Sequence, residues 1–257
     1  MNPFTYEFGY SYSVAWGSAI PLGIGVALAV VSNFLHWRRW LITLGAIMAV
    51  WGCVSLVVIH YLIRINLPIV VPDHFMATTS GQVVDIGAGS GRSTVGLLLA
   101  RPGLRVTATD IYNGYFGIDD NTPDRLIRNA RIAGVADRAE AKVGDARALP
   151  LGSGTYDGAM SVASIDHLRS DEIPQALSEA ARVLKPEGEF LLAVVDPDLL
   201  TWIAAPPLAA HHRPAVASRW REQLQVAGFR IEEEGREVGI LYFLAKKLNS
   251  ERRGGAE

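Results

Sequence analysis

The sequence predicts an α/β fold, in which a mostly parallel sheet carries helices on both faces and is preceded by two transmembrane helices. Beyond residue 80, strand-like apolar runs alternate with helical segments, which is typical of parallel sheets. The first run ends in an acid followed by three alternating glycines, which indicates a ligand-binding turn. Before residue 65, two long apolar segments hold no Asp, Glu, Lys or Arg.

The two apolar segments cover residues 8–37 and 40–63, and Arg38–Arg39 separates them. Each exceeds the roughly 20 residues that cross a bilayer. They show almost no polar stripe, which a long helix on a soluble core would have. Gly45 and Ala49 form a small-residue face that allows close helix contact. We expect a membrane hairpin that either crosses the bilayer or enters it without crossing.

The segment Val83–Gly91 reads VVDIGAGSG and predicts a strand that enters a tight turn. Gly87, Gly89 and Gly91 can adopt positive φ and let the backbone approach a bound molecule, while the following helix offers free N–H groups. The dinucleotide fingerprint G-x-G-x-x-G needs its third glycine one residue later. The spacing therefore favours S-adenosylmethionine over NAD as the bound molecule.

Acidic residues end three successive predicted strands. Asp85 closes the first, Asp110 follows the run Leu104–Thr109, and Asp145 follows the third. A carboxylate after the second strand can accept hydrogen bonds from both hydroxyls of a ribose, although a dehydrogenase could also place an acid there. A fourth strand is predicted at Tyr156–Val162.

With these motifs the chain resembles the class I S-adenosylmethionine-dependent methyltransferases, in particular the small-molecule branch that includes ubiquinone and menaquinone C-methyltransferases. The resemblance covers residues 81–248. It includes RVLKPEG at 182–188, similar to the family's RVLKPGG with Glu187 in place of a glycine, and AGF at 227–229 before the sixth strand. It implies a Rossmann-like, seven-stranded methyltransferase sheet with S-adenosylmethionine as cofactor.

The resemblance also assigns roles to single residues. Asp85 would hold the ammonium group of the cofactor, Asp110 its ribose, Ile111 the adenine ring and Asp145 the adenine amino group, while the first two loop glycines would wrap the methionine end. For Asp110 and Asp145 the alternative is an ordinary solvated loop acid. The implied cofactor-binding set is Asp85, Gly87, Ala88, Gly89, Gly91, Asp110, Ile111, Gly144, Asp145, Ala146 and Ser161.

Methyl transfer from a sulfonium is an in-line displacement, which needs a base only if the acceptor must lose a proton. Asp166 and His167 follow the fourth predicted strand and are the catalytic candidates, because histidine has a suitable pKa for a general base. The alternative is a helix-starting acid beside a structural histidine. Arg92, Arg147 and Asp157 are interpreted as supporting residues.

Candidate acceptor contacts come from two segments. One follows Asp110, and the other is the insertion 199–214, LLTWIAAPPLAAHHRP, which is too apolar for an ordinary exposed loop. We expect the insertion either to dip into the membrane face or to form a lid over an apolar substrate. Core packing or an interfacial position is the alternative for each candidate. The candidates are Tyr112, Tyr115, Phe116, Trp202, His211 and His212.

The chain is divided into a hairpin at 1–64, a juxtamembrane linker at 65–80, a methyltransferase domain at 81–248 and a polar tail at 249–257. The short linker, or the hairpin itself, is expected to cover part of the cofactor site. Because S-adenosylmethionine is expected in the cytosol, the domain is placed on the cytoplasmic side of the membrane. The Arg38–Arg39 turn alone would favour the opposite orientation.

Charge and cysteine content restrict the remaining possibilities. The net charge is −2, and the mildly acidic domain argues against nucleic acid as a partner. A single cysteine, Cys53, lies in an apolar segment, and no cluster has metal-ligand spacing, so no metal is expected. The sequence thus predicts a methyltransferase at the lipid bilayer that acts on a hydrophobic small-molecule or lipid acceptor.

Three alternatives stay open at this point: an enzyme that methylates a side chain of a membrane protein, a non-catalytic membrane-tethered module that binds the cofactor, and an NAD-linked oxidoreductase. The intact glycines and acids disfavour the second, and the loop spacing disfavours the third. The oligomeric state is left open.

Overall fold

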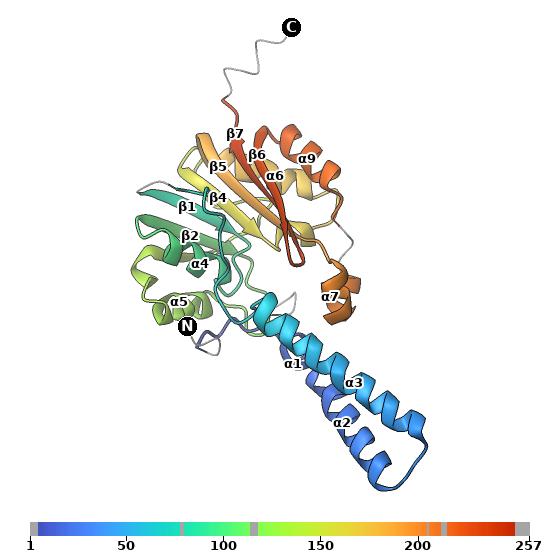
Figure 1. Ribbon diagram of the computed structural model, residues 1–257. Coiled ribbons are helices and arrows are strands. Elements are labelled where there is room, and N and C mark those ends of the chain that lie inside the picture. The colour runs from blue at the N-terminus through green and yellow to red at the C-terminus, as the bar shows by residue number, and fades with distance from the viewer. Residues whose placement is uncertain (1–4, 78–79, 114–117, 205, 212–214, 250–257) are drawn as a thin grey trace.

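The computed structural model describes residues 5–77, 80–113, 118–204, 206–211 and 215–249. Seven strands form one sheet in the order β3-β2-β1-β4-β5-β7-β6, with β7 antiparallel to both of its neighbours (Figure 1). This confirms the predicted Rossmann-like, seven-stranded sheet, whose last two strands form an antiparallel hairpin. The strands are β1 (Gly81–Ile86), β2 (Leu104–Asp110), β3 (Ala139–Val143), β4 (Tyr156–Val162), β5 (Leu184–Val195), β6 (Phe229–Glu237) and β7 (Ile240–Lys247).

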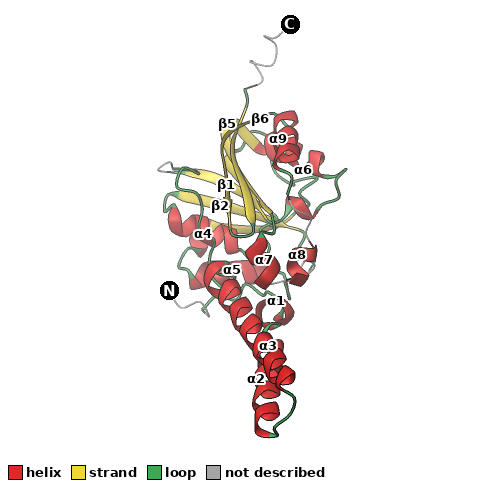
Figure 2. Ribbon diagram, turned by 45° about the vertical axis from the view of Figure 1, so that its right-hand side comes forward, coloured by secondary structure: helices red, strands yellow, loops and turns green. Residues whose placement is uncertain are grey.

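Helices cover both faces of the sheet (Figures 1 and 2). On one face lie α4 (Arg92–Ala100) and α5 (Pro123–Ile132), and on the other lie α6 (Ile173–Val183) and α9 (Ala217–Val226). Neighbouring residues of a strand point to opposite faces, so Val83 packs with α4 and α5 while Val84 packs with α6 and α9. The last four residues of β1, Val83–Ile86, are all buried, as expected for a strand that is covered on both faces.

Local sequence signals set the ends of several elements. The Thr122 side chain accepts a hydrogen bond from the backbone N–H of Arg125, and Pro123 is the first residue of α5. Glu187, which replaces a family glycine, has φ of 59°. A non-glycine residue in this conformation costs roughly 1–2 kcal/mol. The glutamate therefore introduces backbone strain at a position where glycine would have none.

The residues just before the hairpin pack on the α/β domain. The rings of Tyr6 and Phe8 stack with centroids 5.2 Å apart, and both side chains join the core between the sheet, α4 and α5. The backbone N–H of Glu7 donates to Oδ1 of Asn129 on α5 at 2.8 Å. Residues 5–8 thus hold the N-terminal end of the hairpin to the domain.

The hairpin projects from the domain as two antiparallel helices (Figure 1). It consists of α1 (Tyr12–Trp16), α2 (Ala19–Phe34), α3 (Arg39–Val57) and a π-helical end, η1 (Val58–Leu62). A Cβ atom at Gly25 would lie 2.5 Å from the backbone nitrogen of Ala49, and one at Gly45 would lie 2.6 Å from that of Ala29. Only glycine allows this approach, so the predicted small-residue face is confirmed.

Only one helix of the described chain is long and apolar enough to cross a membrane, the 24 residues of Arg39–Leu62. The predicted first span, residues 8–37, is not continuous, because Gly17 and Ser18 separate α1 from α2. With 16 residues, α2 is about 24 Å long, shorter than a hydrocarbon core of about 30 Å. The first of the two predicted transmembrane helices is therefore not confirmed.

The linker after η1 lies along α4, which begins directly after the glycine loop. The Arg92 guanidinium donates to the carbonyl oxygens of Leu67 at 2.7 Å, Ile63 at 2.9 Å and Arg64 at 3.0 Å. Arg101, at the other end of α4, donates to carbonyl oxygens of residues 72, 73 and 75. Two arginines thus hold the linker against the domain.

We predict that Arg92→Ala destabilises the protein by about 2 kcal/mol, because three carbonyl groups lose a charged hydrogen-bond donor. Thermal unfolding in detergent and protease sensitivity of the linker measure the effect. Arg105→Ala is the matched control, since Arg105 donates one exposed hydrogen bond, to the Asp137 carbonyl. Equal losses in the two variants would contradict a special role of Arg92.

Candidate functional site

A cavity of about 730 Å³ lies at the carboxyl ends of β1, β2 and β4, where ligands bind in open α/β sheets. This volume is within the range of small-molecule sites. The cavity brings together most of the predicted cofactor residues and one catalytic candidate. These are Gly87, Ala88, Gly89, Asp110, Ile111, Gly144, Asp145, Ala146 and His167.

The glycine loop is held against β2. The backbone N–H groups of Gly87 and Ala88 both donate to the carbonyl of Thr109, at 2.8 and 3.0 Å. Gly87, Gly89 and Gly91 have φ of 75°, 52° and 88°, a region that favours glycine. The loop therefore adopts the predicted conformation. Gly91 does not line the cavity and instead precedes the first residue of α4.

Asp110 links the loop to the segment after β2. One carboxylate oxygen accepts from the Gly89 N–H at 2.9 Å, and the other accepts from the Tyr112 N–H at 2.8 Å and the Asn121 amide at 3.2 Å. A carboxylate offers about four acceptor sites. If it is to bind two ribose hydroxyls, at least one of these partners, such as Asn121, must move away.

Asp85 lies beneath the loop and is completely buried. Its Oδ2 accepts from the hydroxyls of Ser93 at 2.6 Å and Thr94 at 2.7 Å. Burial raises the pKa of the Asp85 carboxyl to about 6, although these hydrogen bonds act in the opposite direction. Asp85 does not line the cavity. Its hydrogen bonds connect β1 to the first turn of α4.

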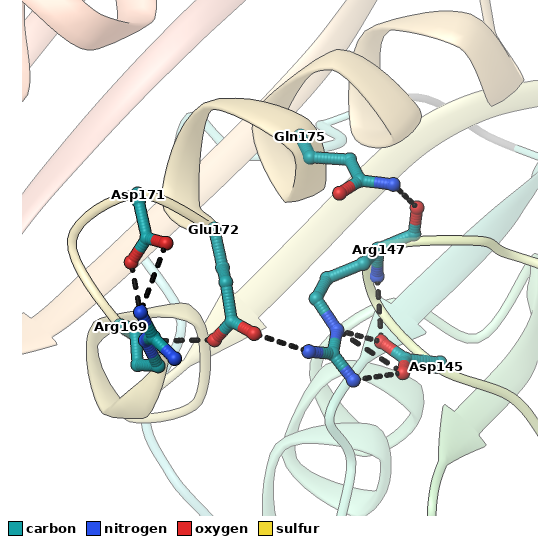
Figure 3. Close-up of polar contacts among 6 residues, drawn as sticks. All are labelled: Asp145, Arg147, Arg169, Asp171, Glu172 and Gln175. Carbon is teal, nitrogen blue, oxygen red and sulfur yellow. Dashed lines mark hydrogen bonds and ion pairs between the residues drawn. The ribbon is translucent and has the colours of Figure 1, made fainter.

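Asp145 belongs to a charged network at the cavity wall (Figure 3). The Arg147 guanidinium donates to both of its oxygens, at 2.6 Å in the shortest contact, and also pairs with Glu172. Hydrogen bonding to Arg147 holds the pKa of the Asp145 carboxyl below its usual value. Asp145 is therefore an ionised acceptor in a fixed position, and Arg147 supports it.

The two catalytic candidates lie on η3 (Ile165–His167), directly after β4. His167 lines the cavity. Oδ2 of Asp166 instead accepts from the backbone N–H of Val195 at 2.9 Å, and so ties η3 to the end of β5. Asp166 holds the segment that carries His167. Ser161 is buried inside β4, outside the cavity lining.

Of the predicted acceptor contacts, the two whose side chains the structure describes, Tyr112 and Trp202, lie outside the cavity lining. Tyr112 has φ of 51° and a buried hydroxyl without a hydrogen-bond partner in the described chain, and burial raises its pKa. Trp202 is 43% exposed on α7 (Leu199–Ala204). Tyr115, Phe116 and His212 lie outside the described residues. His211 ends α8 (Pro206–His211), and its side chain is likewise outside the described part.

The cavity has a second wall that local motifs did not reveal. It comes from the base of the hairpin, the linker and the turn between β6 and β7. The linker residues agree with the expected cover of the site, but no local signal predicted the turn at residues 237–240. The apolar residues of this wall include Val14, Leu62, Ile63, Ile65, Ile69 and Val70.

Comparison with protein families gives one match in this region. Residues 83–188 match the model described as a methyltransferase domain. A ubiquinone/menaquinone biosynthesis C-methyltransferase of Cereibacter sphaeroides is 32% identical over 122 residues, 46% of this chain and 44% of the relative. A malonyl-(acyl-carrier protein) O-methyltransferase of Halorhodospira halophila is 29% identical over 153 residues, 58% of this chain and 48% of the relative. The chain thus spans about half the length of these relatives.

Solved structures share the fold at low sequence identity. A geranyl diphosphate methyltransferase in complex with S-adenosylmethionine has a TM-score of 0.53 at 13% identity, covering 68% of this chain and 82% of that one. A (4+2)-cyclase, SpnF, has a TM-score of 0.54 at 17% identity, covering 68% and 78%. At this sequence identity the likeness shows the fold alone.

We predict that Asp110→Asn weakens S-adenosylmethionine binding roughly 10- to 100-fold, because a charged acceptor at the cavity is lost. Calorimetry on the detergent-solubilised protein measures the dissociation constant. Asp157→Asn is the control, since Asp157 accepts from the Gln82 N–H and Lys185 at the start of β4. Unchanged affinity in Asp110→Asn would remove this residue from the site.

Asp85→Asn should change the pH dependence of stability. The pKa of about 6 in the folded state exceeds the ordinary aspartate value of 3.8, so the folded state binds the proton more tightly and stability falls as pH rises between these values. In the wild type we expect a loss on the order of 2–3 kcal/mol across this window, and in the variant a much flatter profile. Denaturant unfolding at several pH values tests this. Asp124→Asn, at an exposed acid of α5, should keep the wild-type profile.

Proposed function

We propose that this chain, which carries a class I S-adenosylmethionine-dependent methyltransferase domain, transfers the cofactor's methyl group to a hydrophobic or lipid-like acceptor while its hairpin holds it at a membrane. One observation carries the proposal. A single cavity is bounded on one side by the glycine loop and the acids of the strand ends, and on the other by the apolar base of the hairpin.

The first side of the cavity fits the cofactor. The loop glycines leave room for close backbone approach, and the carboxylates of Asp110 and Asp145 face the same space as acceptors for hydroxyl and amino groups. Ile111 is 45% exposed and offers an apolar surface to a flat ring. S-adenosylmethionine supplies an electrophilic methyl group there. Buried Asp85 contributes negative charge beneath the loop, favourable for the ammonium end.

The second side of the cavity favours an apolar acceptor. Ile63, Ile65, Ile69 and Val70 present hydrocarbon, and they belong to the hairpin end and the linker. The relative named as a ubiquinone/menaquinone biosynthesis C-methyltransferase supports a small-molecule acceptor of this kind. The cavity walls align such a molecule with the methyl group and exclude water, which is most of what an in-line displacement requires.

His167 is proposed as the group that accepts the acceptor's proton. It lines the cavity just after β4, and the hydrogen bond from Val195 to Asp166 fixes the short helical turn that carries it. Asp166 therefore acts as a positioning residue. A neutral imidazole at this place can remove a proton from a hydroxyl, amine or activated carbon as the methyl group arrives.

The membrane part of the proposal rests on the hairpin. Its exposed surface carries large apolar side chains on both helices, among them Ile24 and Val30 of α2 and Ile47 and Val50 of α3. Water does not favour such a surface, whereas lipid does. With the cofactor in the cytosol, the domain lies on the cytoplasmic side.

Measurement of cofactor binding and methyl transfer tests the proposal. We expect the solubilised protein to bind S-adenosylmethionine and not NAD in calorimetry, and to move a radiolabelled methyl group into a lipid extract. Binding without transfer to any lipid or membrane-protein fraction would favour the non-catalytic module. Transfer only to membrane proteins would replace the small-molecule acceptor by a side chain.

The same assay tests His167. In His167→Ala we expect turnover to fall roughly 10²- to 10⁴-fold with cofactor binding retained, because a general base is lost. His74→Ala is the matched control, since His74 is 81% exposed and pairs with Glu233. Near-normal turnover of His167→Ala across the pH range would exclude His167 as the base.

A further inference from the structure

The apolar insertion after β5 leaves the domain and packs against the middle of the membrane helix. Indole Nε1 of Trp51 on α3 donates to the carbonyl of Ile203 at 2.6 Å, and the hydroxyl of Ser55 donates to the carbonyl of Ala204. These carbonyls belong to the end of α7, a region where unpaired acceptors are normal. Two hydrogen bonds therefore fix the position of α7 along α3.

The position of α7 on α3 sets its depth if α3 crosses a bilayer. Trp51 is twelve residues from Arg39, or about 18 Å along the helix axis. The hydrocarbon core is about 30 Å thick. If Arg39 lies at the boundary of the hydrocarbon core farthest from the domain, Trp51 lies about 12 Å below the boundary nearest the domain, because about 18 Å of the roughly 30 Å are already crossed. The end of α7 lies at the same level.

The exposed face of α7 suits such an environment. Leu199, Trp202 and Ile203 are 77%, 43% and 43% exposed and have the i, i+3, i+4 spacing of one helix face. No Asp, Glu, Lys or Arg occurs from residue 199 to 211. The opposite face holds Thr201, which is buried and lines the cavity.

A second apolar surface lies at the same level. Ile47, Val50 and Val54 of α3 line a groove of about 440 Å³ with Ile203 of α7. The groove continues the exposed apolar surface of α3, and its walls run along the helix, as a lipid chain does in a bilayer. A protein partner would also need polar contacts at its rim. Lipid chains are therefore the occupant that fits this surface.

We infer that α7 is submerged in the leaflet nearest the methyltransferase domain, and that the cavity opens into this leaflet between α7 and the end of η1. The inference rests on the proposed membrane anchoring. Thr201 of α7 and Leu62 of η1 both line the cavity, and Leu199 and Leu62 are 77% and 50% exposed. An apolar acceptor thus reaches the methyl donor from within the bilayer.

The test uses site-specific fluorescent labels on the full chain. Cys53 is the only cysteine, so Cys53→Ala gives a background for single cysteines. Leu199→Cys and Leu62→Cys report on α7 and the cavity mouth. Val30→Cys on the exposed face of α2 is the membrane control, and Ser218→Cys on α9 is the control for the domain. Each variant is labelled with an environment-sensitive fluorophore and reconstituted into phosphatidylcholine–phosphatidylglycerol vesicles that contain nitroxide lipids.

We expect nitroxides to quench the labels at Val30, Leu199 and Leu62 and to leave the label at Ser218 unaffected. At Leu199, a nitroxide near the headgroup end of the acyl chain should quench more than one near the chain terminus. Quenching at Val30 without quenching at Leu199 or Leu62 would overturn the inference and leave the anchoring intact. No quenching at Val30 would overturn the anchoring and the inference together.

Discussion

The hydrogen bonds of Arg92 are the constraint on which the arrangement of this protein depends. Arg92 is the first residue of α4, so its backbone follows the glycine loop that cradles the cofactor side of the cavity. Its side chain donates hydrogen bonds to three carbonyl oxygens where the hairpin ends and the linker begins. Arg92 thus joins the end of the hairpin to the glycine loop, and residues of both line the cavity.

Much of the fold could be predicted because its signals are local. Alternating apolar runs, the Gly87–Gly91 loop and the Thr122–Pro123 start of α5 each depend on a few neighbouring residues. The acids at the strand ends were also predictable, because parallel strands bring their carboxyl ends to one edge. Asp110 and Asp145 accordingly line one cavity.

The remaining features depend on contacts between distant parts of the chain. Composition could not show that the apolar segment 8–37 breaks at Gly17–Ser18, nor that residues 5–8 return to α5. The resemblance assigned Asp85 to the ammonium group of the cofactor, but no sequence signal showed that two hydroxyls of α4 donate to its carboxylate. The carboxylate of Asp166 accepts a hydrogen bond from the backbone N–H of Val195 in β5, and no sequence motif indicates this contact.

The hairpin is tied to the domain at both of its ends, by Glu7 to Asn129 before α1 and by Arg92 after η1. Its two helices also touch through glycines, which leaves little room for sliding. A domain held in this way cannot swing freely about the hairpin. With the hairpin in a bilayer, as proposed, the height of the reaction centre over the membrane plane would be a fixed length, and acceptors would be selected by how far their reactive atom stands from the lipid chains that hold them.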